Sequence, residues 1–143
     1  SDGGNYDLIR QKEDWMELVT SDSPGIPHLV MDGNPVFRWA VFTMAKVAQE
    51  TLEKSGITAD DLDVFLPHQA NLRIVDALAR ATHLPERVQV ADDIIHNGNT
   101  SAASIPLALH AMLADGRAKS GDKALMIAFG AGLSYAAQVV TAP

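Results

Sequence analysis

Three polar stretches hold the residues of this chain whose types suit catalysis or ligand binding: Pro67-His68-Gln69-Ala70-Asn71, His96-Asn97-Gly98-Asn99-Thr100 and Gly130-Ala131-Gly132. They supply an imidazole, which is a common catalytic group, carboxamides, which donate and accept hydrogen bonds, and backbone amides on a glycine turn. Each stretch has a structural alternative when it is taken alone. His68 suits a cap of the following helix, Asn99 or Asn97 suits an N-cap, and the glycines suit an ordinary turn.

The spacing of the other residues disfavours several kinds of site. The 5 histidines lack the paired short spacings of a zinc site and the chain has 0 cysteines, so we expect no metal. The lack of cysteine also leaves this chain without a thiolate nucleophile. No G-x-S-x-G sequence is present to hold a nucleophilic serine, and a lone Gly-x-Gly gives little support for a nucleotide site.

Strands and helices alternate along the part of the chain that must position these stretches. Apolar runs predict strands over 64–66, 88–90, 123–129 and 133–140, with the last two joined by the glycine turn as an antiparallel pair. Helical periodicity is found over 34–54, 70–81 and from 99 to about 114. Ligands of such layered α/β domains gather beyond the carboxyl ends of strands, where the polar stretches lie.

The first long helix marks a boundary in the chain. Asn34 is predicted as its N-cap and Pro35 as its first residue. One apolar face is predicted at Phe37, Val41, Met44, Ala48 and Leu52. Residues 1–33, rich in Asp, Gly, Ser and Pro, are predicted to be a linker segment with an edge strand at Leu29-Val30-Met31, and residues 34–143 to be the domain proper.

The composition is typical of one compact globular domain, with 143 residues of which 47% are hydrophobic and 20% charged. A net charge of -7 opposes general binding to nucleic acid or to an anionic membrane, so any anionic partner requires a local basic patch. The first residues lack a secretory signal pattern and no apolar stretch is long enough to span a bilayer. These features favour a cytoplasmic location.

Four motifs follow one another along the chain: Met31-Asp32-Gly33-Asn34-Pro35-Val36-Phe37-Arg38, Pro67-His68-Gln69-Ala70-Asn71-Leu72-Arg73-Ile74, Gly98-Asn99-Thr100-Ser101-Ala102-Ala103-Ser104-Ile105-Pro106 and Phe129-Gly130-Ala131-Gly132. In this order they resemble β-ketoacyl-acyl-carrier-protein synthase III. The likeness covers nearly the whole chain but only the C-terminal half of such an enzyme, whose N-terminal half carries a nucleophilic cysteine. It implies an α/β, thiolase-like fold, namely one βαβαβαββ half of a layered αβαβα condensing enzyme.

The resemblance implies an activity that joins two acyl groups. In that family the cysteine takes an acyl group from acyl-CoA, and malonyl-acyl-carrier protein then loses CO2 and attacks the thioester, which starts fatty acid or polyketide chains. His68 and Asn99 are implied as the two donors to the malonyl thioester oxygen, and the motif selects Asn99 over Asn97. Decarboxylation leaves negative charge on that oxygen, which neutral donors stabilise without reorganising. We expect a neutral imidazole because the N-terminus of the following helix disfavours protonation.

Other positions take their expected roles from the same resemblance. The backbone N–H of Ala131 corresponds to an oxyanion donor for acyl transfer, although glycine is commoner there and tolerates positive φ better. The pantetheine tunnel is implied at Met31, Gly33, Phe37, Ala70, Asn71 and Ile74, with core packing as the alternative for Phe37 and Ile74. Acidic carrier protein is implied to dock on Arg38, Arg73 and Arg80, with solvated helix residues as the alternative.

The same likeness sets the expected partners. These are acyl-CoA, malonyl-acyl-carrier protein, the N-terminal half with its cysteine and a second copy in a homodimer, with no cofactor because acyl-CoA is a substrate. The isolated chain is predicted to be inactive in condensation because it lacks the nucleophile. Two alternatives stay open: a non-catalytic domain that binds acyl groups or carrier protein, and another acyltransferase of the thiolase superfamily. Two donors at one oxygen weigh against the first.

Overall fold

A four-stranded sheet organises the protein in the computed structural model, which describes residues 1–23 and 25–143. Its strands are β3 (Val64–Pro67), β4 (Gln89–Val90), β5 (Lys123–Gly130) and β6 (Ser134–Thr141), in the order β4-β3-β5-β6. β3 runs parallel to β4 and β5, and β6 is antiparallel to β5. The strands predicted from apolar runs and the antiparallel final pair are therefore confirmed.

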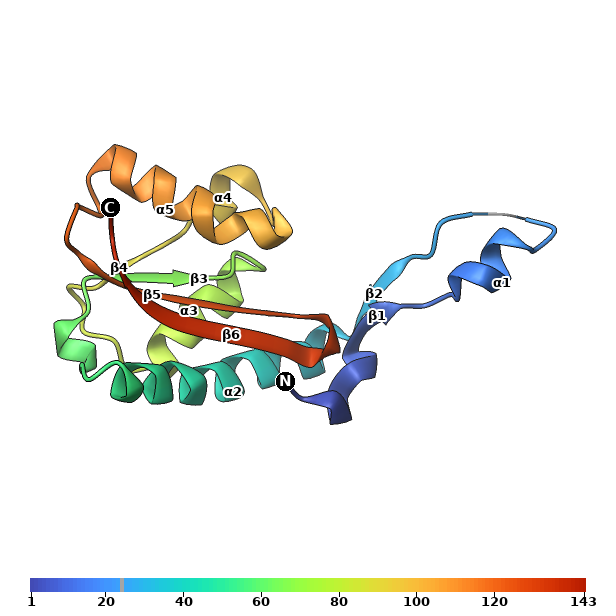
Figure 1. Ribbon diagram of the computed structural model, residues 1–143, viewed down its shortest axis with the longest axis horizontal. Coiled ribbons are helices and arrows are strands. Elements are labelled where there is room, and N and C mark those ends of the chain that lie inside the picture. Colours follow the sequence, from blue (N-terminus) through green and yellow to red (C-terminus); the bar gives the residue numbers. More distant parts are fainter. Residues whose placement is uncertain (24) are drawn as a thin grey trace.

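Helices cover both faces of this sheet. Figure 1 shows α2 (Gly33–Lys54) and α3 (Leu72–Ala81) on one side, and α4 (Ile94–Asn97) and α5 (Ser104–Asp115) on the other. β3 is buried at all four positions, as expected for a central strand that has helices on both faces. From β2 onward the element order is β-α-β-α-β-α-β-β if the single-turn α4 is set aside, which agrees with the predicted half-fold.

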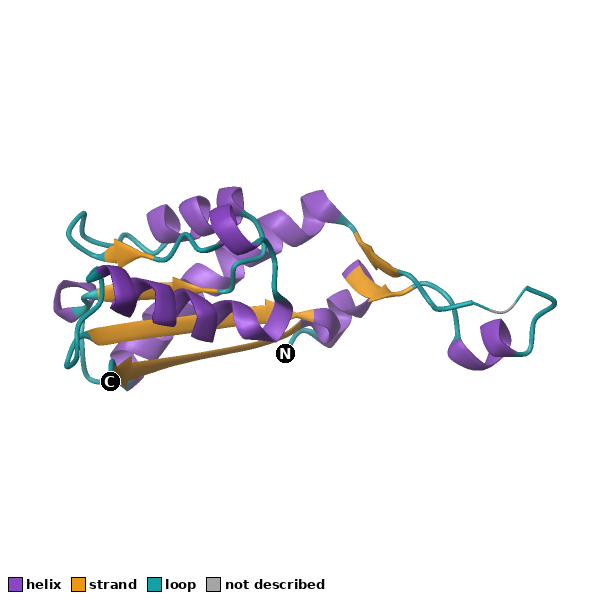
Figure 2. Ribbon diagram, turned by 90° about the horizontal axis from the view of Figure 1, so that it is seen from above, coloured by secondary structure: helices purple, strands orange, loops and turns teal. Residues whose placement is uncertain are grey.

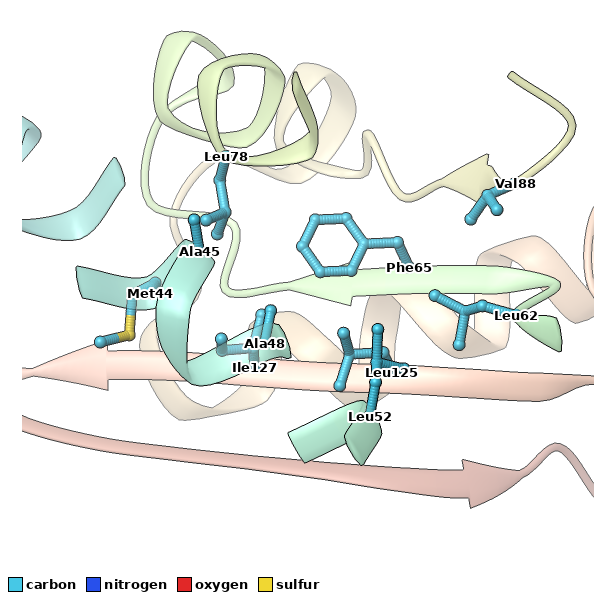
Figure 3. Close-up of a cluster of buried hydrophobic side chains, with 10 residues drawn as sticks. All are labelled: Met44, Ala45, Ala48, Leu52, Leu62, Phe65, Leu78, Val88, Leu125 and Ile127. Carbon is cyan, nitrogen blue, oxygen red and sulfur yellow. The ribbon is translucent and has the colours of Figure 1, made fainter. Parts of the chain in front are cut away.

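The main core lies between the sheet and the pair of helices α2 and α3. Alternate strand residues supply it from one side, with Phe65 of β3 and Leu125 and Ile127 of β5, and Met44 and Leu78 supply it from the helices (Figure 3). A second cluster forms on the opposite face, where the intervening strand residues meet α5. Its buried members are Val64, Leu66, Ala91, Ala108, Met112, Ala118 and Ala124. The two clusters fix the register of β3.

Three helices begin at other residues than predicted. α2 begins at Gly33 with Asp32 as N-cap rather than Asn34, and Pro35 is tolerated in its first turn because the N–H groups there have no intrahelical partner. α3 begins at Leu72 instead of residue 70, because the Asn71 side chain accepts a hydrogen bond from Arg73 N and caps it. α5 begins at Ser104, after a 3-10 turn η3 (Ser101–Ala103).

Packing within α2 also differs in part from the predicted apolar face. Val41, Met44, Ala48 and Leu52 are buried as predicted. Phe37 is only half-buried, and the neighbouring Val36 is buried in its place. Phe37 is thereby available to line a cavity.

The first 31 residues contain more structure than the linker predicted for residues 1–33. They form a 3-10 segment η1 (Gly3–Leu8), β1 (Ile9–Gln11), α1 (Trp15–Val19) and β2 (Leu29–Met31), while residue 24 lies outside the described part. The predicted strand at 29–31 exists, but it pairs antiparallel with β1 instead of bordering the main sheet. Figure 2 shows this hairpin and α1 extending away from the main body.

A tight turn, η4 (Ala131–Leu133), joins β5 to β6. Gly132 adopts φ 122°, and a Cβ at this position would lie 2.8 Å from Ser134 Oγ. Ala131 is not among the residues with positive φ, so the glycine requirement of this turn falls on position 132.

We predict that Gly132→Ala lowers the free energy of unfolding by about 1–3 kcal/mol, because an alanine is strained at this positive φ. Gly130→Ala is the matched control: Gly130 has an extended backbone, with φ -164°, and a Cβ added there would meet no heavy atom within 4 Å. Its free energy of unfolding should change by less than about 0.5 kcal/mol. Urea unfolding of both variants measures the difference, and equal effects would contradict the turn geometry.

Candidate functional site

His68 extends the parallel pairing of β3 and β5 beyond the end of β3. Its backbone N–H donates to Ile127 O at 2.8 Å, which fixes the residue at the carboxyl edge of the sheet. The half-buried imidazole places Nδ1 2.7 Å from Ser104 Oγ, and its ring meets the Phe129 ring edge-on with centroids 5.8 Å apart. Burial lowers the pKa of His68, so the neutral form is favoured. The helix whose N-terminus was expected to favour the neutral ring, α3, begins at Leu72, two residues later than predicted.

Asn99 lies in the loop between α4 and η3. Its Oδ1 accepts a hydrogen bond of 2.9 Å from the backbone N–H of Ser101, which orients the carboxamide. Within the described residues its Nδ2 has no hydrogen-bond partner, so this donor is available. Asn97 is different, because its Nδ2 already donates to Asp93 Oδ1 at 2.9 Å. The two carboxamides of this loop therefore differ in which atom is anchored, Oδ1 in Asn99 and Nδ2 in Asn97.

A cavity of about 440 Å³ opens beside these residues, between the start of α2 and the start of α3. Each position assigned to the tunnel from the sequence lines it: Met31, Gly33, Phe37, Ala70, Asn71 and Ile74. Five further residues complete the lining: Asn34, Val36, Arg73, Asn99 and Phe129. Of the three predicted donor residues, Asn99 lines the cavity and His68 and Ala131 do not. His68 is connected to the cavity through its contact with Phe129. Ile74 is at once a core residue and a cavity residue.

The three arginines assigned to carrier-protein docking are all exposed but occupy different places. Arg73, in the first turn of α3, lines the cavity. Arg38 lies on α2 and Arg80 in the last turn of α3, and neither lines it. The structure brings only Arg73 to the cavity.

Two further residues at the site, Phe129 and Ser104, belong to the motifs named above but were given no role from the sequence. Phe129 is the last apolar residue before the glycine turn, so its pattern is that of an ordinary strand residue, yet it touches both His68 and the cavity. Ser104 is buried and bonded to His68, but a serine at the start of a helix gives no signal beyond local capping. Both are revealed by contacts between residues distant in the chain.

The N-terminal residues support the η4 turn from behind. Asp2 and Leu133 exchange two backbone hydrogen bonds, of 2.7 Å and 3.1 Å. Asp2 Oδ2 also accepts from Trp39 Nε1 at 2.9 Å, and hydrogen bonds from Asn5 and Trp39 lower the pKa of the Asp2 carboxyl. The Trp39 ring packs edge-on against Phe129 at 5.8 Å. A continuous set of contacts thus joins Asp2, Trp39 and Phe129 to His68.

A metal-binding cluster and a membrane-spanning helix are both absent from the described residues. They contain no group of three or more His, Cys, Asp or Glu side chains placed to hold a metal ion. None of their helices is long and apolar enough to cross a membrane.

Comparison with known proteins identifies the family. Residues 52–142 match the family model described as 3-Oxoacyl-[acyl-carrier-protein (ACP)] synthase III C terminal. The chain belongs to the β-ketoacyl-acyl-carrier-protein synthase III family. It is 54% identical to the β-ketoacyl-[acyl-carrier-protein] synthase III of Streptomyces glaucescens, with 100% of this chain aligned to 43% of that protein. It is 52% identical to the mycobacterial synthase III of Mycobacterium avium (strain 104), again over 100% of this chain and 43% of the relative.

Two solved structures share the fold. The priming β-ketosynthase from the R1128 polyketide biosynthetic pathway aligns with a TM-score of 0.94 and 47% identity, over 99% of this chain and 42% of that one. The synthase III of Thermus thermophilus aligns with a TM-score of 0.82 and 42% identity, over 99% of this chain and 43% of that one. The predicted thiolase-like fold is confirmed. The chain spans less than half the length of these relatives.

The pKa of His68 leads to a prediction about pH. Because burial lowers the pKa in the folded state, the unfolded chain binds more protons between the two pKa values. The stability contributed by neutral His68 is thus fully present above its unfolded pKa of about 6.5 and is lost as the pH falls towards the folded pKa. A ring-resolved NMR titration should give a midpoint for His68 below the ordinary value. A midpoint at or above it would contradict the buried, neutral imidazole.

Proposed function

We propose that this chain is the C-terminal half of a β-ketoacyl-acyl-carrier-protein synthase III that condenses an acyl-CoA starter with malonyl-acyl-carrier protein and thereby initiates fatty acid synthesis. The nucleophilic cysteine belongs to the N-terminal half, and this half supplies the donors for decarboxylation. One observation carries the proposal: residues of one short stretch, from η3 to the start of α5, form hydrogen bonds with both candidate donor side chains. Ser104 Oγ is hydrogen-bonded to His68 Nδ1, and the Ser101 N–H donates to Asn99 Oδ1. In each side chain the bonded atom is not the one that would donate to the thioester oxygen.

The chemistry asks for donors that are neutral and already oriented. Loss of CO2 from the malonyl group leaves an enolate whose negative charge develops on the thioester oxygen. His68 Nε2 and Asn99 Nδ2 are suited to bind this oxygen, because both are neutral donors on side chains anchored elsewhere. The half-buried position of His68 strengthens the interaction by excluding part of the water.

The cavity is the proposed channel for the pantetheine arm of both substrates. A long arm with few charges is matched by a lining that combines apolar residues such as Phe37 and Ile74 with the amide of Asn71. This role is supported by two contacts, since Asn99 lines the cavity and Phe129, which also lines it, packs against the His68 ring.

The backbone N–H of Ala131 is the proposed oxyanion donor for acyl transfer to the cysteine. An alanine suffices here, because only the amide is required and the positive φ of the turn is taken by Gly132. The paired backbone hydrogen bonds between Asp2 and Leu133 support the position of the turn.

Carrier protein is proposed to dock around Arg73, with Arg38 and Arg80 as more distant members of the same basic patch. A chain with net charge -7 repels an acidic partner except at such a local patch, and Arg73 is the arginine next to the cavity. The isolated chain is proposed to be inactive in condensation because it has 0 cysteines. A cytoplasmic location, a homodimer and pairing with an N-terminal half complete the proposal, and the last two rest on the family resemblance.

The proposal predicts large losses of malonyl decarboxylation in the complete enzyme. His68→Ala and Asn99→Ala should each lower the decarboxylation rate of malonyl-acyl-carrier protein by about 10²–10³-fold, the usual cost of one lost oxyanion donor. Asn97→Ala is the matched control, because the Asn97 carboxamide is bonded to Asp93. Measuring CO2 release tests the three variants. A wild-type rate in either donor variant would remove its assigned role, whereas a complete wild-type protein that releases no CO2 would favour a binding domain without turnover.

The docking proposal predicts a selective change in KM. Arg73→Glu should raise the KM for malonyl-acyl-carrier protein up to about tenfold, equivalent to about 1.4 kcal/mol, with a smaller change for acyl-CoA. Lys46→Glu is the control, since it makes the same charge change on the exposed side of α2. Steady-state kinetics at low and high salt measure the effect, which salt should weaken. Equal KM changes for both substrates, or for both variants, would contradict docking at Arg73.

A further inference from the structure

We propose that Ser104 is a positioning residue that fixes the tautomer of His68, keeping the proton on Nε2 and the lone pair on Nδ1. This inference rests on the proposed function, in which Nε2–H is the donor to the enolate oxygen. The juxtaposition that carries it is a buried hydroxyl 2.7 Å from Nδ1, the ring nitrogen across the imidazole from Nε2, with a backbone N–H that donates to the same hydroxyl oxygen.

The hydroxyl has two partners, and they determine the direction of its proton. Ser104 is 1% exposed, so water does not complete its hydrogen bonds. Its Oγ lies 3.3 Å from the backbone N–H of Gln69, which can only donate. Among the described residues the other partner is His68 Nδ1, which is therefore the acceptor for the hydroxyl proton.

The opposite tautomer would cost a hydrogen bond. If Nδ1 carried the proton and donated it to Ser104 Oγ, the oxygen would accept twice and its own buried proton would have no acceptor among the described residues. Leaving a buried donor unpaired disfavours a state by about tenfold or more. A neutral His68 therefore holds its proton on Nε2, and the lowered pKa keeps the ring neutral.

The surroundings hold the Gln69 N–H and the Ser104 hydroxyl in place. The buried Gln69 side chain donates to Pro67 O at 2.8 Å and to Ala91 O at 3.3 Å, and accepts from Ile94 N at 3.0 Å. These bonds join the loop after β3 to the segment after β4. Ser104 is the first residue of α5, so its position is set by the helix that covers the other face of the sheet. The direction of the Nδ1 bond is thus built into the fold.

The tautomer determines whether the His68 ring attracts or repels the enolate oxygen. With the proton on Nε2, the ring presents a donor to the negative oxygen of the enolate. With the proton on Nδ1, the ring would present a lone pair and repel the same oxygen. The tautomer decides whether His68 stabilises or opposes the transition state, and a group bonded to the far nitrogen controls it.

The direct test is an NMR measurement of the ring nitrogens of His68 in the complete enzyme labelled with 15N-histidine. Long-range 1H–15N correlations should show a protonated Nε2 and an unprotonated Nδ1 near neutral pH. This result requires no variant, so it does not depend on whether a substitution is tolerated. Protonation of Nδ1 in the wild-type enzyme would overturn the proposal.

Variants connect the tautomer with the rate. Ser104→Ala should give a mixture of tautomers and lower malonyl decarboxylation about tenfold, with the KM for acyl-CoA unchanged, whereas Ser104→Thr retains a hydroxyl and should restore the wild-type tautomer. Thr82→Ala is the control, because it removes another buried hydroxyl, which donates to Leu78 O at 2.8 Å. Its tautomer and rate should match the wild type. A wild-type tautomer in Ser104→Ala would contradict the role of Ser104.

The two proposals fail in different ways. If His68→Ala keeps the wild-type decarboxylation rate, the proposed function is wrong while the wild-type NMR result still stands. If the wild-type spectrum shows a protonated Nδ1, the role of Ser104 is wrong even when His68→Ala is inactive.

Discussion

The parallel pairing of β3 with β5 is the constraint on which the site depends. It continues past the end of β3, where the backbone N–H of His68 donates to Ile127 O at 2.8 Å. The pairing is stable because β3 is buried on both faces, with Phe65 against α2 and α3 and with Val64 and Leu66 against α5. A change in register would move these side chains to the wrong faces and carry the imidazole away from its partners. The packing of the core and the placement of the imidazole therefore both follow from the hydrogen bonds between β3 and β5.

The two candidate donors are held by a common principle. His68 is anchored at Nδ1 and Asn99 at Oδ1, so in each side chain the atom remote from the donor is already bonded. Orienting these side chains in advance removes the rotational freedom that substrate would otherwise have to restrict. The left-handed backbone of Ser101, with φ 55°, is part of this arrangement, since strain at a non-glycine residue persists where surrounding contacts require it. Asn97 in the same loop is anchored differently, because its Nδ2 donates to Asp93 Oδ1.

Much of the fold could be predicted from the sequence, because the buried run of β3 and the periodicity of α2 are strong signals. The start of α3 was predicted two residues too early, since the Asn71 side chain bonds the backbone N–H of Arg73 and caps the helix there. The short elements before residue 32 were not predicted in full because they depend on distant partners. At the site, His68 and Asn99 came from motif resemblance, because an isolated histidine or asparagine has an ordinary structural explanation. Ser104 and Phe129 lie 36 residues or more from His68 and join it only through the tertiary fold, so neither spacing nor composition could show them.

Residues from both sides of the predicted boundary at residue 33 line the cavity, so the segment before it is more than a linker. Met31 ends the projecting hairpin, yet it lines the same space as Ile74 from the main body. On the other side, Asp2 holds the η4 turn and bonds to Trp39, which packs behind Phe129. The N-terminal segment therefore contributes Met31 to the cavity lining and supports the η4 turn. A site with walls from both ends of the chain is complete only when the whole fold has formed, which ties its geometry to the stability of the core.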